Sequence, residues 1–410
     1  MSNKIKIGNN ILNNNFGDII LKMHFTEETT FSFTLKDSYY YDCVVDWGDD
    51  SQDKIINSYM ENSCTNVISD TYMTAGSEIL PNLTPSECYD ERIHVYQAGT
   101  YYLRITGRCE TIAMVGNKNL IEVVSWGDPN ITKLSYIRFK GCKNLTKLPN
   151  ERGGLKFVET FRDSFAKTKI SEIPFGIFDY NEIVTDFDST FYNCELLTKL
   201  PNDLFKYNIN VTNFDSTFKN CFILPKIPNN LFRYNVNVTN FNSIFVSCNK
   251  IKKLPDDLFK YNVNVLSFET SFMGSKIKKL PDELFKYNIM ASAFTSCFES
   301  CPNLEIISED LFRYNTSITN LHRIFVGTAL KEIPYNLFIY NTSVTDFSEA
   351  FYGSDQLTGI APKLWDNNIW SSATSYINCF DSTGSLGTNG TTIPTSWGGS
   401  CSSGINCTGL

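Results

Sequence analysis

Histidine is nearly absent from this sequence: three residues in 410, far apart at His24, His94 and His322. No paired-histidine metal motif, phosphate-binding loop or nucleophile motif occurs. The close cysteine pair Cys297 and Cys301 has C-x-x-x-C spacing without histidine partners, which argues against zinc. We therefore expect no metal, no cofactor and no catalytic site, and so no enzyme.

Long apolar stretches are also absent. No segment approaches the ~18 consecutive apolar residues of a membrane-spanning helix, and residues 1–18 contain no apolar run typical of a signal peptide. The net charge of −8 gives the whole chain no attraction to nucleic acid or acidic membranes. We expect a soluble protein without membrane insertion or nucleic-acid partner. A surface location would then require a signal removed from this sequence or an export route that uses none.

What the sequence does contain is a repeat. The pattern L/I-P-x-x-L-F-x-Y-N, or a close variant, recurs every 26 or 27 residues, with copies that begin at Ile173, Leu200, Ile227, Leu254, Leu280, Ile307, Ile333 and Ile360. A second block, F-x-x-x-F-x-x followed by a small residue, comes after each anchor, as at Phe214, Phe218 and Cys221. A fixed period of this length predicts a stack of repeated coils, a solenoid.

Each repeat predicts a local structure. The stretch L-x-x-L-P predicts one strand per coil, and nine such strands begin at Leu145, Ile170, Leu197, Leu224, Ile251, Ile277, Leu304, Leu330 and Leu357. The proline ends the strand and suits the first turn of a short helix, P-x-x-L-F-x-Y-N, whose asparagine would be left-handed. The block V-T-N-F-x-x-x-F places two aromatic side chains on one face. These pairs account for the 31 phenylalanines and predict an aromatic core, not a ligand box.

Thirteen cysteines invite a disulfide interpretation. One repeat position is occupied by Cys142, Cys194, Cys221, Cys248 and Cys301, and in other coils by Thr168, Ser275, Thr328 and Ser354. A position that accepts Cys, Ser and Thr selects for small size, so we expect a reduced, buried ladder. Disulfides remain open for Cys64, Cys88, Cys401 and Cys407, which lie outside this ladder.

Residues 25–107 alternate apolar and polar side chains, as the strands of a β-sandwich do. Residues 45–51 (VDWGDDS) and 96–101 (YQAGTY) resemble the paired WGDG and Y-x-x-x-G-T-Y motifs of PKD-type immunoglobulin-like domains. An insertion at about 53–92 separates them, and we expect either a recognition loop, an extra hairpin or a packed loop. The acidic turn at Asp49-Asp50 could bind calcium, but an Asx-type turn explains it better.

The combination of a WGD-containing sandwich and F-x-x-C-x-x-L-x-x-L-P repeats resembles the BspA-like leucine-rich-repeat proteins of bacterial surfaces and some phages, over residues 25–400. The resemblance implies adhesion or recognition without catalysis. The IGNN and FGD segments of the N-terminus resemble leaders of some bacteriophage structural proteins.

The expected fold is mainly β with short helices. Its parts are a β leader for attachment (1–24), a PKD/Ig-like sandwich (25–107), a right-handed leucine-rich-repeat solenoid (108–383) and a C-terminal cap with tail (384–410). No Pro/Ser/Gly-rich linker separates the sandwich from the solenoid, so we expect a rigid junction.

A lysine column is the candidate binding site. Of the two central residues of each L-x-x-L strand, we expect the first in the core and the second exposed. The second is lysine in four consecutive coils, and the column with its neighbours comprises Lys199, Lys226, Lys252, Lys253, Lys278 and Lys279. This predicts a basic stripe ~15–20 Å long at ~4.8 Å per coil, which could bind an anionic surface glycan or protein. The alternative is that these lysines only keep an open sheet face soluble.

Two function classes follow. The first is a recognition or adhesion protein on a virion or cell surface, such as a phage tail, fibre or capsid decoration, or a bacterial adhesin. The second is a purely structural virion component that contacts other virion proteins through residues 1–107. Binding to host glycans or cells separates the two.

Overall fold

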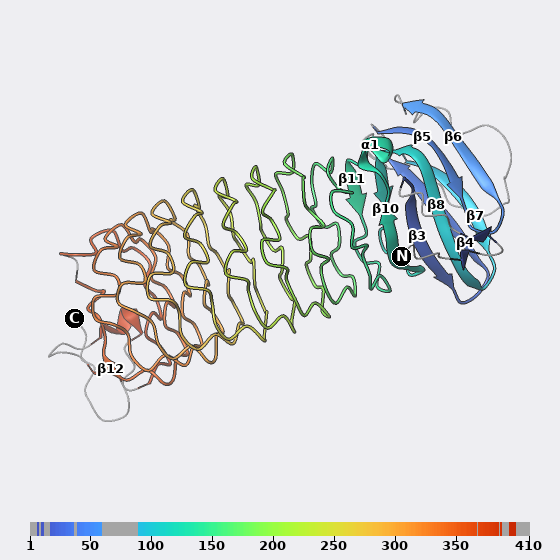
Figure 1. The fold of residues 1–410 in the computed structure, drawn as a ribbon. Helices are drawn as coiled ribbons and strands as arrows, with labels where there is room; N and C mark the ends of the chain where they lie inside the picture. Colours follow the sequence, from blue (N-terminus) through green and yellow to red (C-terminus); the bar gives the residue numbers. More distant parts are fainter. Residues whose placement is uncertain are drawn as a thin grey trace, which may run out of the picture.

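Figure 1 shows an elongated molecule with a β-sandwich at one end and a stack of repeated coils along the rest. The computed structural model describes residues 6–7, 10–11, 17–36, 39–59, 89–366, 368–384, 386–387 and 393–398. Its fold is mainly β: the helical segments of the described part are α1 (Pro129–Thr132) and the 3-10 turn η1 (Thr395–Trp397). Neither is long and apolar enough to cross a membrane.

The sandwich consists of two sheets. The larger has, in spatial order, β10 (Leu120–Trp126), β3 (Ile19–Phe25), β8 (Gly99–Cys109), β5 (Tyr40–Asp46) and β6 (Gln52–Tyr59). The smaller has β11 (Tyr136–Arg138), β9 (Thr111–Ala113), β4 (Thr29–Lys36) and β7 (Tyr89–Tyr96). Their inner faces meet in an aromatic core, where the rings of Phe25 and Tyr96 stack with centroids 4.2 Å apart. A hairpin of β1 (Lys6–Ile7) and β2 (Asn10–Ile11) precedes the sandwich in the chain.

The sandwich extends beyond the predicted limits of 25–107. Strand β3 comes from the predicted leader and pairs with both β10 and β8. Strands β9, β10 and β11 come from the segment assigned to the solenoid. The sequence misled here because residues 139–149 already carry repeat-like residues, while the strands before them lack a motif. Of the predicted insertion 53–92, the two ends belong to β6 and β7, and residues 60–88 lie outside the described residues.

The two sheets continue directly into the stack. Strand β10 forms a parallel bridge from Glu122 to Lys147, and β11 forms one from Tyr136 to Thr160. At the same junction the indole of Trp126 is fully buried and packs 6.1 Å from the ring of Phe139. The backbone pairing of the sandwich is thus extended by the first coils without an intervening linker.

One long column of backbone bridges joins each coil to the next. It runs in parallel through Thr160, Asp186, Asn213, Asn240, Ser267, Ala293, Asn320, Asp346 and Ser375. On its C-terminal side, alternate N–H groups donate to the next coil, for example Phe214 to Asn240 (3.1 Å) and Phe218 to Ile244 (3.1 Å). The predicted strand at L-x-x-L-P is therefore wrong. That stretch forms isolated bridges, at Lys199 and Lys279 among others, and a short strand only where β12 (Gly359–Ile360) pairs with β13 (Leu386–Gly387).

The predicted helix P-x-x-L-F-x-Y-N is also wrong, because this segment consists of tight turns. Its bonds span three residues, as from the Lys206 N–H to the Asp203 oxygen (3.0 Å). Nor is the asparagine of Tyr-Asn left-handed; in the coil of Asn208, positive φ angles occur instead at Asp203, Ser216 (φ 53°) and Asn220 (φ 62°). Short turns suit a coil that must close within 26 or 27 residues.

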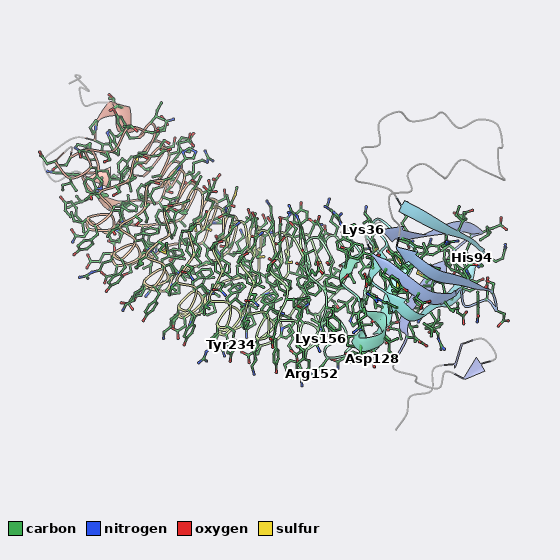
Figure 2. All side chains as sticks on the ribbon, turned by 90° about the horizontal axis from the view of Figure 1, so that it is seen from above. Lys36, His94, Asp128, Arg152, Lys156 and Tyr234 are labelled. Atoms are coloured by element: carbon green, nitrogen blue, oxygen red, sulfur yellow. The ribbon has the colours of Figure 1, made fainter. Side chains whose placement is uncertain are left out.

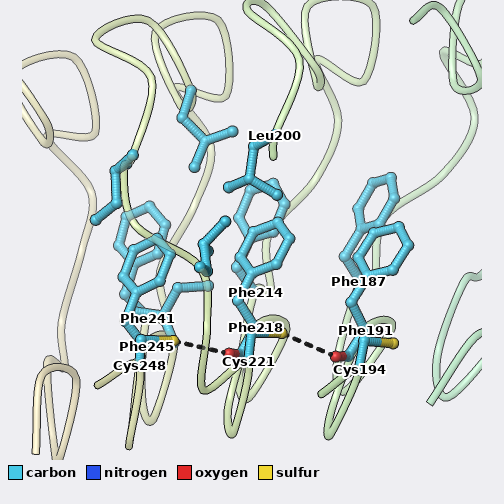
Figure 3. Close-up of a cluster of buried hydrophobic side chains, with 14 of the residues drawn as sticks. Phe187, Phe191, Cys194, Leu200, Phe214, Phe218, Cys221, Phe241, Phe245 and Cys248 are labelled. Carbon is cyan, nitrogen blue, oxygen red and sulfur yellow. Dashed lines mark hydrogen bonds between the residues drawn. The ribbon is translucent and has the colours of Figure 1, made fainter. Parts of the chain in front are cut away.

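The interior of the stack is built from three columns of phenylalanine rings, two of which are labelled in Figure 3. The two predicted columns contain Phe187 and Phe191, which stack on their counterparts Phe214 and Phe218 with centroids 5.5 and 5.6 Å apart. The third was not predicted and consists of Phe178, Phe205, Phe232, Phe259, Phe285, Phe312 and Phe338. Because each buried aromatic side chain contributes large apolar area, these columns supply much of the stabilising burial.

The predicted ladder of small residues is confirmed in the described part of the chain. Its cysteines are free and buried. The thiols of Cys194, Cys221, Cys248 and Cys301 each donate to a carbonyl of the preceding coil, and that of Cys142 donates to Met114 beside strand β9. Figure 3 shows two of these bonds, from Cys221 to Phe191 (3.4 Å) and from Cys248 to Phe218 (3.2 Å). The hydroxyl of Ser354 makes the same contact with Phe325 at 2.9 Å. A small donor is thus what the position requires. Cys64, Cys88, Cys401 and Cys407 lie outside the described residues.

A second ladder, of asparagines, was not predicted. It consists of the Tyr-Asn residues Asn181, Asn208, Asn235, Asn262, Asn288, Asn315 and Asn341, all buried. The side-chain amide of Asn208 donates to the carbonyl oxygens of Phe178 (3.2 Å) and Asn181 (2.7 Å) in the preceding coil. The next five asparagines repeat this contact. The ladder satisfies backbone acceptors inside the stack, where water is excluded.

At the C-terminal end of the stack, an aromatic side chain covers the last coil. Trp397 of η1 is buried and stacks on Tyr376 with ring centroids 4.6 Å apart, and its carbonyl accepts from the Phe380 N–H at 2.9 Å. Part of the predicted cap (384–410) therefore closes the core.

Candidate functional site

The structure places the predicted lysines on one face. Lys199, Lys226, Lys253 and Lys279 are exposed at equivalent positions in consecutive coils, each followed by a buried leucine or isoleucine. Lys252 and Lys278 are exposed as well, so the predicted alternation of inward and outward residues is wrong. The apolar residues of L-x-x-L both face the core, which leaves both central residues to solvent.

Ion pairs divide this lysine column into two parts. Lys278 lies 3.5 Å from Glu305, and Lys279 lies 3.1 Å from Asp282. The remaining members, Lys199, Lys226, Lys252 and Lys253, form no ion pair with another described residue. Exposed pairs add little stability, but they neutralise charge. The positive charge available to a partner is thus concentrated on three coils, between 199 and 253.

A second row of cations lies beside the column and was missed in the sequence. The turn segment ends in K/R-Y, and the cation of one coil lies over the tyrosine ring of the next. The ring-centroid distances are 5.9 Å for Lys206 over Tyr234, 5.3 Å for Arg233 over Tyr261, 5.5 Å for Lys286 over Tyr314 and 5.4 Å for Arg313 over Tyr340. Figure 2 shows Tyr234 and Arg152 on the same long edge of the stack. We call this row the tyrosine edge; its signal in the sequence was the recurring K/R-Y pair.

Two grooves lie between neighbouring turns, and the first connects the lysine column with the tyrosine edge. One, of about 480 Å³, is lined by Lys226 and Lys253 of the lysine column and by Arg233 and Tyr261 of the tyrosine edge. The next, of about 760 Å³, is lined by lysines 252, 253, 278 and 279 together with four carboxylates. The first groove holds three cations and two carboxylates, whereas the second holds four of each, so the excess of positive charge that suits an anion lies in the first.

The other candidate sites considered in the sequence are structural. Hydrogen bonds to Asp49 Oδ1 from the Ser51 N–H (3.2 Å) and hydroxyl (2.5 Å) form the predicted Asx-type turn. His94 Nε2 lies 2.7 Å from the other oxygen. Although partial burial opposes it, these hydrogen bonds lower the pKa of Asp49. Throughout the described residues, no group of three or more His, Cys, Asp or Glu is arranged to hold a metal ion.

The ladder cysteines are not reactive sites. Burial raises the pKa of Cys194 and of Cys248 to about 12, and that of Cys301 to about 11. Because the thiolate is the reactive species, these side chains are chemically inert at neutral pH.

Comparison with known proteins identifies no family. No protein-family model and no curated protein matches the chain. Among solved structures, the Toll–Spatzle complex, described as a molecular hub in Drosophila development and innate immunity, matches at 15% identity with a TM-score of 0.30. The match covers 62% of this chain and 42% of that one, so it spans less than half of the other chain. A likeness at this TM-score carries no argument about function.

Proposed function

We propose that this chain is a non-catalytic recognition protein whose lysine column binds an anionic polysaccharide on a cell surface. If the protein belongs to a virion, that cell is the host. The observation that carries the proposal is the cluster Lys199, Lys226, Lys252 and Lys253, exposed on consecutive coils without ion pairs in the described chain. The column runs along the stack, so a linear polymer lying along the axis meets one coil after another. Cations aligned in this way raise the local concentration of an anionic ligand.

The architecture supports this role. A rigid stack joined without a linker to a sandwich presents a fixed surface at a distance from whatever holds the sandwich. We also propose that the stack is a right-handed, BspA-like leucine-rich-repeat solenoid and that the sandwich is PKD-like. The protein would be displayed on a virion or cell surface, and in a virion its sandwich end would contact neighbouring virion proteins. A purely structural virion component, or a bacterial adhesin, is the alternative.

Replacing Lys199, Lys226, Lys253 and Lys279 with serine is expected to abolish salt-sensitive binding to acidic polysaccharides with little change in melting temperature. Lys279 is already paired with Asp282, so the loss comes from the other three lysines: at about 0.7 kcal/mol for each exposed contact they amount to about 2.1 kcal/mol, roughly thirtyfold in Kd. Binding is measured to immobilised hexuronate, sulfated and neutral polysaccharides and to polyglutamate, at low and moderate salt.

The matched control replaces Lys118, Lys167, Lys219 and Lys363, which lie outside the column, and so removes the same total charge. Its binding should equal that of the unmodified chain. Retained salt-sensitive binding by the column variant would refute the proposal. Binding to polyglutamate alone would indicate an acidic protein partner, and binding to nothing would favour the assembly role.

A further inference from the structure

The coil of Arg233 lacks the acidic residue that the coils on both sides of it carry in the turn after proline, Asp203 and Asp257. In three coils an acid lies three residues before the tyrosine-edge cation and pairs with it: Asp257 with Lys260 (3.3 Å), Glu283 with Lys286 (2.9 Å) and Asp310 with Arg313 (3.0 Å). In the coil of Arg233 the equivalent residue is Asn230, and the residue before it is Asn229. Neither can neutralise a guanidinium.

Arg233 is consequently available for a ligand. It forms no ion pair with another described residue, while its position is fixed by the rings of Tyr234 (5.9 Å) and Tyr261 (5.3 Å). Lys226 of the same coil and Lys253 of the next are also without ion pairs in the described chain, and both line the same groove of about 480 Å³.

The groove combines charge with hydrogen-bonding groups. Asn229 and Asn230 line it together with the three cations, and so do Asp256 and Asp257. A guanidinium binds a carboxylate or a sulfate through two parallel hydrogen bonds, while amides and carboxylates bind sugar hydroxyls. The volume lies within the roughly 300–1,000 Å³ of small-ligand clefts.

We infer that this groove is the subsite that holds the carboxylate or sulfate group of one acidic sugar unit, with Arg233 as its main contact. The inference rests on the proposed function, because the sugar unit belongs to the polymer that lies along the lysine column. The lysine column alone would let the polymer slide along the stack. The subsite in the coil of Lys226 and Arg233, whose turn carries two asparagines, would hold one sugar unit in place and so fix the position of the polymer along the column. An acidic protein partner is less suited, because the cations lie in a groove of about 480 Å³ and not on a flat surface.

The test restores the missing acid. N230D places a carboxylate at the position where three later coils carry an acid paired with its cation, so the fold tolerates it and Arg233 acquires an internal partner. We expect binding of a hexuronate oligosaccharide, or of a sulfated oligosaccharide of equal length, to weaken about tenfold. D257N removes an acid from the same groove and frees Lys260, and is expected to strengthen binding several-fold. The relative affinity for the two oligosaccharides distinguishes carboxylate from sulfate as the group bound.

N336D is the matched control, because Asn336 occupies the equivalent position in a coil where Ile339 replaces the cation. It adds the same charge outside the groove and should leave affinity unchanged.

If N230D binds like the unmodified chain while the lysine-column variant does not bind, the subsite is refuted and the proposed function stands. If N230D and N336D weaken binding equally, the effect is one of net charge and the subsite is again refuted. Loss of polyglutamate binding alone would assign the groove to a protein and overturn the inference. If the unmodified chain binds no oligosaccharide, both proposals fail.

Discussion

Replacing Asn235 with aspartate is expected to lower the free energy of unfolding of the stack by about 3–5 kcal/mol, the usual cost of a buried charge without a partner. Asn235 is fully buried, and its side-chain amide donates to the carbonyl oxygens of Phe205 (3.0 Å) and Asn208 (2.8 Å). A carboxylate has no hydrogen to donate, so its oxygen would face two carbonyl oxygens or would have to take up a proton. Denaturant titration followed by circular dichroism measures the difference.

N237D is the matched control. Asn237 is exposed two residues further along, and its amide donates once, to the Ile209 oxygen at 3.1 Å. The same substitution should cost less than about 1 kcal/mol there, as losses of exposed hydrogen bonds do. Both variants add one negative charge to the same coil, so their difference measures the contribution of the buried ladder. Equal destabilisation would show that the ladder contributes nothing specific.

The repeat allowed much of the interior to be predicted. Pairs such as Phe214 and Phe218 recur at a fixed position, and a position shared by Cys221, Ser275 and Thr328 had to be small and buried. Both predictions are confirmed, since these side chains are buried and the phenylalanine rings stack. They succeeded because they depend only on which residue types recur at a repeat position, and not on backbone conformation. The Asx-type turn at Asp49 was predictable for a similar reason, since its bonds are local.

Backbone conformation was predicted less well. The apolar pattern of L-x-x-L-P suits a strand, yet the long column of bridges passes through Asn213 instead, in a segment that contains the left-handed residue Ser216. Asn208 looked like the end of a helix because asparagine tolerates left-handed conformations. Its burial depends on carbonyl groups of the preceding coil, which no local pattern reveals.

The sequence predicted which lysines form the candidate site, but not which of them are neutralised by ion pairs. The sequence placed Lys199, Lys226 and Lys253 in one column, and the structure places them there. Which lysines are neutralised depends on partners elsewhere in space, such as Glu305 for Lys278, and the tyrosine edge depends on contacts between coils. The asymmetry at Asn230 becomes meaningful only once the acids of three later coils, Asp257, Glu283 and Asp310, are seen to bind their own cations.

Alkaline pH is expected to destabilise the stack steeply through its cysteine ladder. Unfolded thiols ionise near pH 8.5, whereas burial raises the pKa of folded Cys194 and Cys248 to about 12 and that of Cys221 above its ordinary value. Between those values the unfolded state binds fewer protons, so stability is intact below about pH 8 and is lost as pH rises. From pH 8 to 10 each thiol should cost about 2 kcal/mol, or about 6 kcal/mol for three.

The triple variant C194S/C221S/C248S isolates this effect, because serine occupies the same position at Ser275 and Ser354 and does not titrate. Denaturant titrations of both proteins at pH 8, 9 and 10 should show the variant losing about 6 kcal/mol less than the unmodified chain over this range. Tyr41 and Tyr96, whose pKa values burial also raises, contribute equally to both proteins and cancel. Identical pH slopes would mean that the thiols ionise in the folded stack. The coils would then have to open to water at the Cys221 position, and the rigid row of charges on which the proposed binding face depends would lose its support.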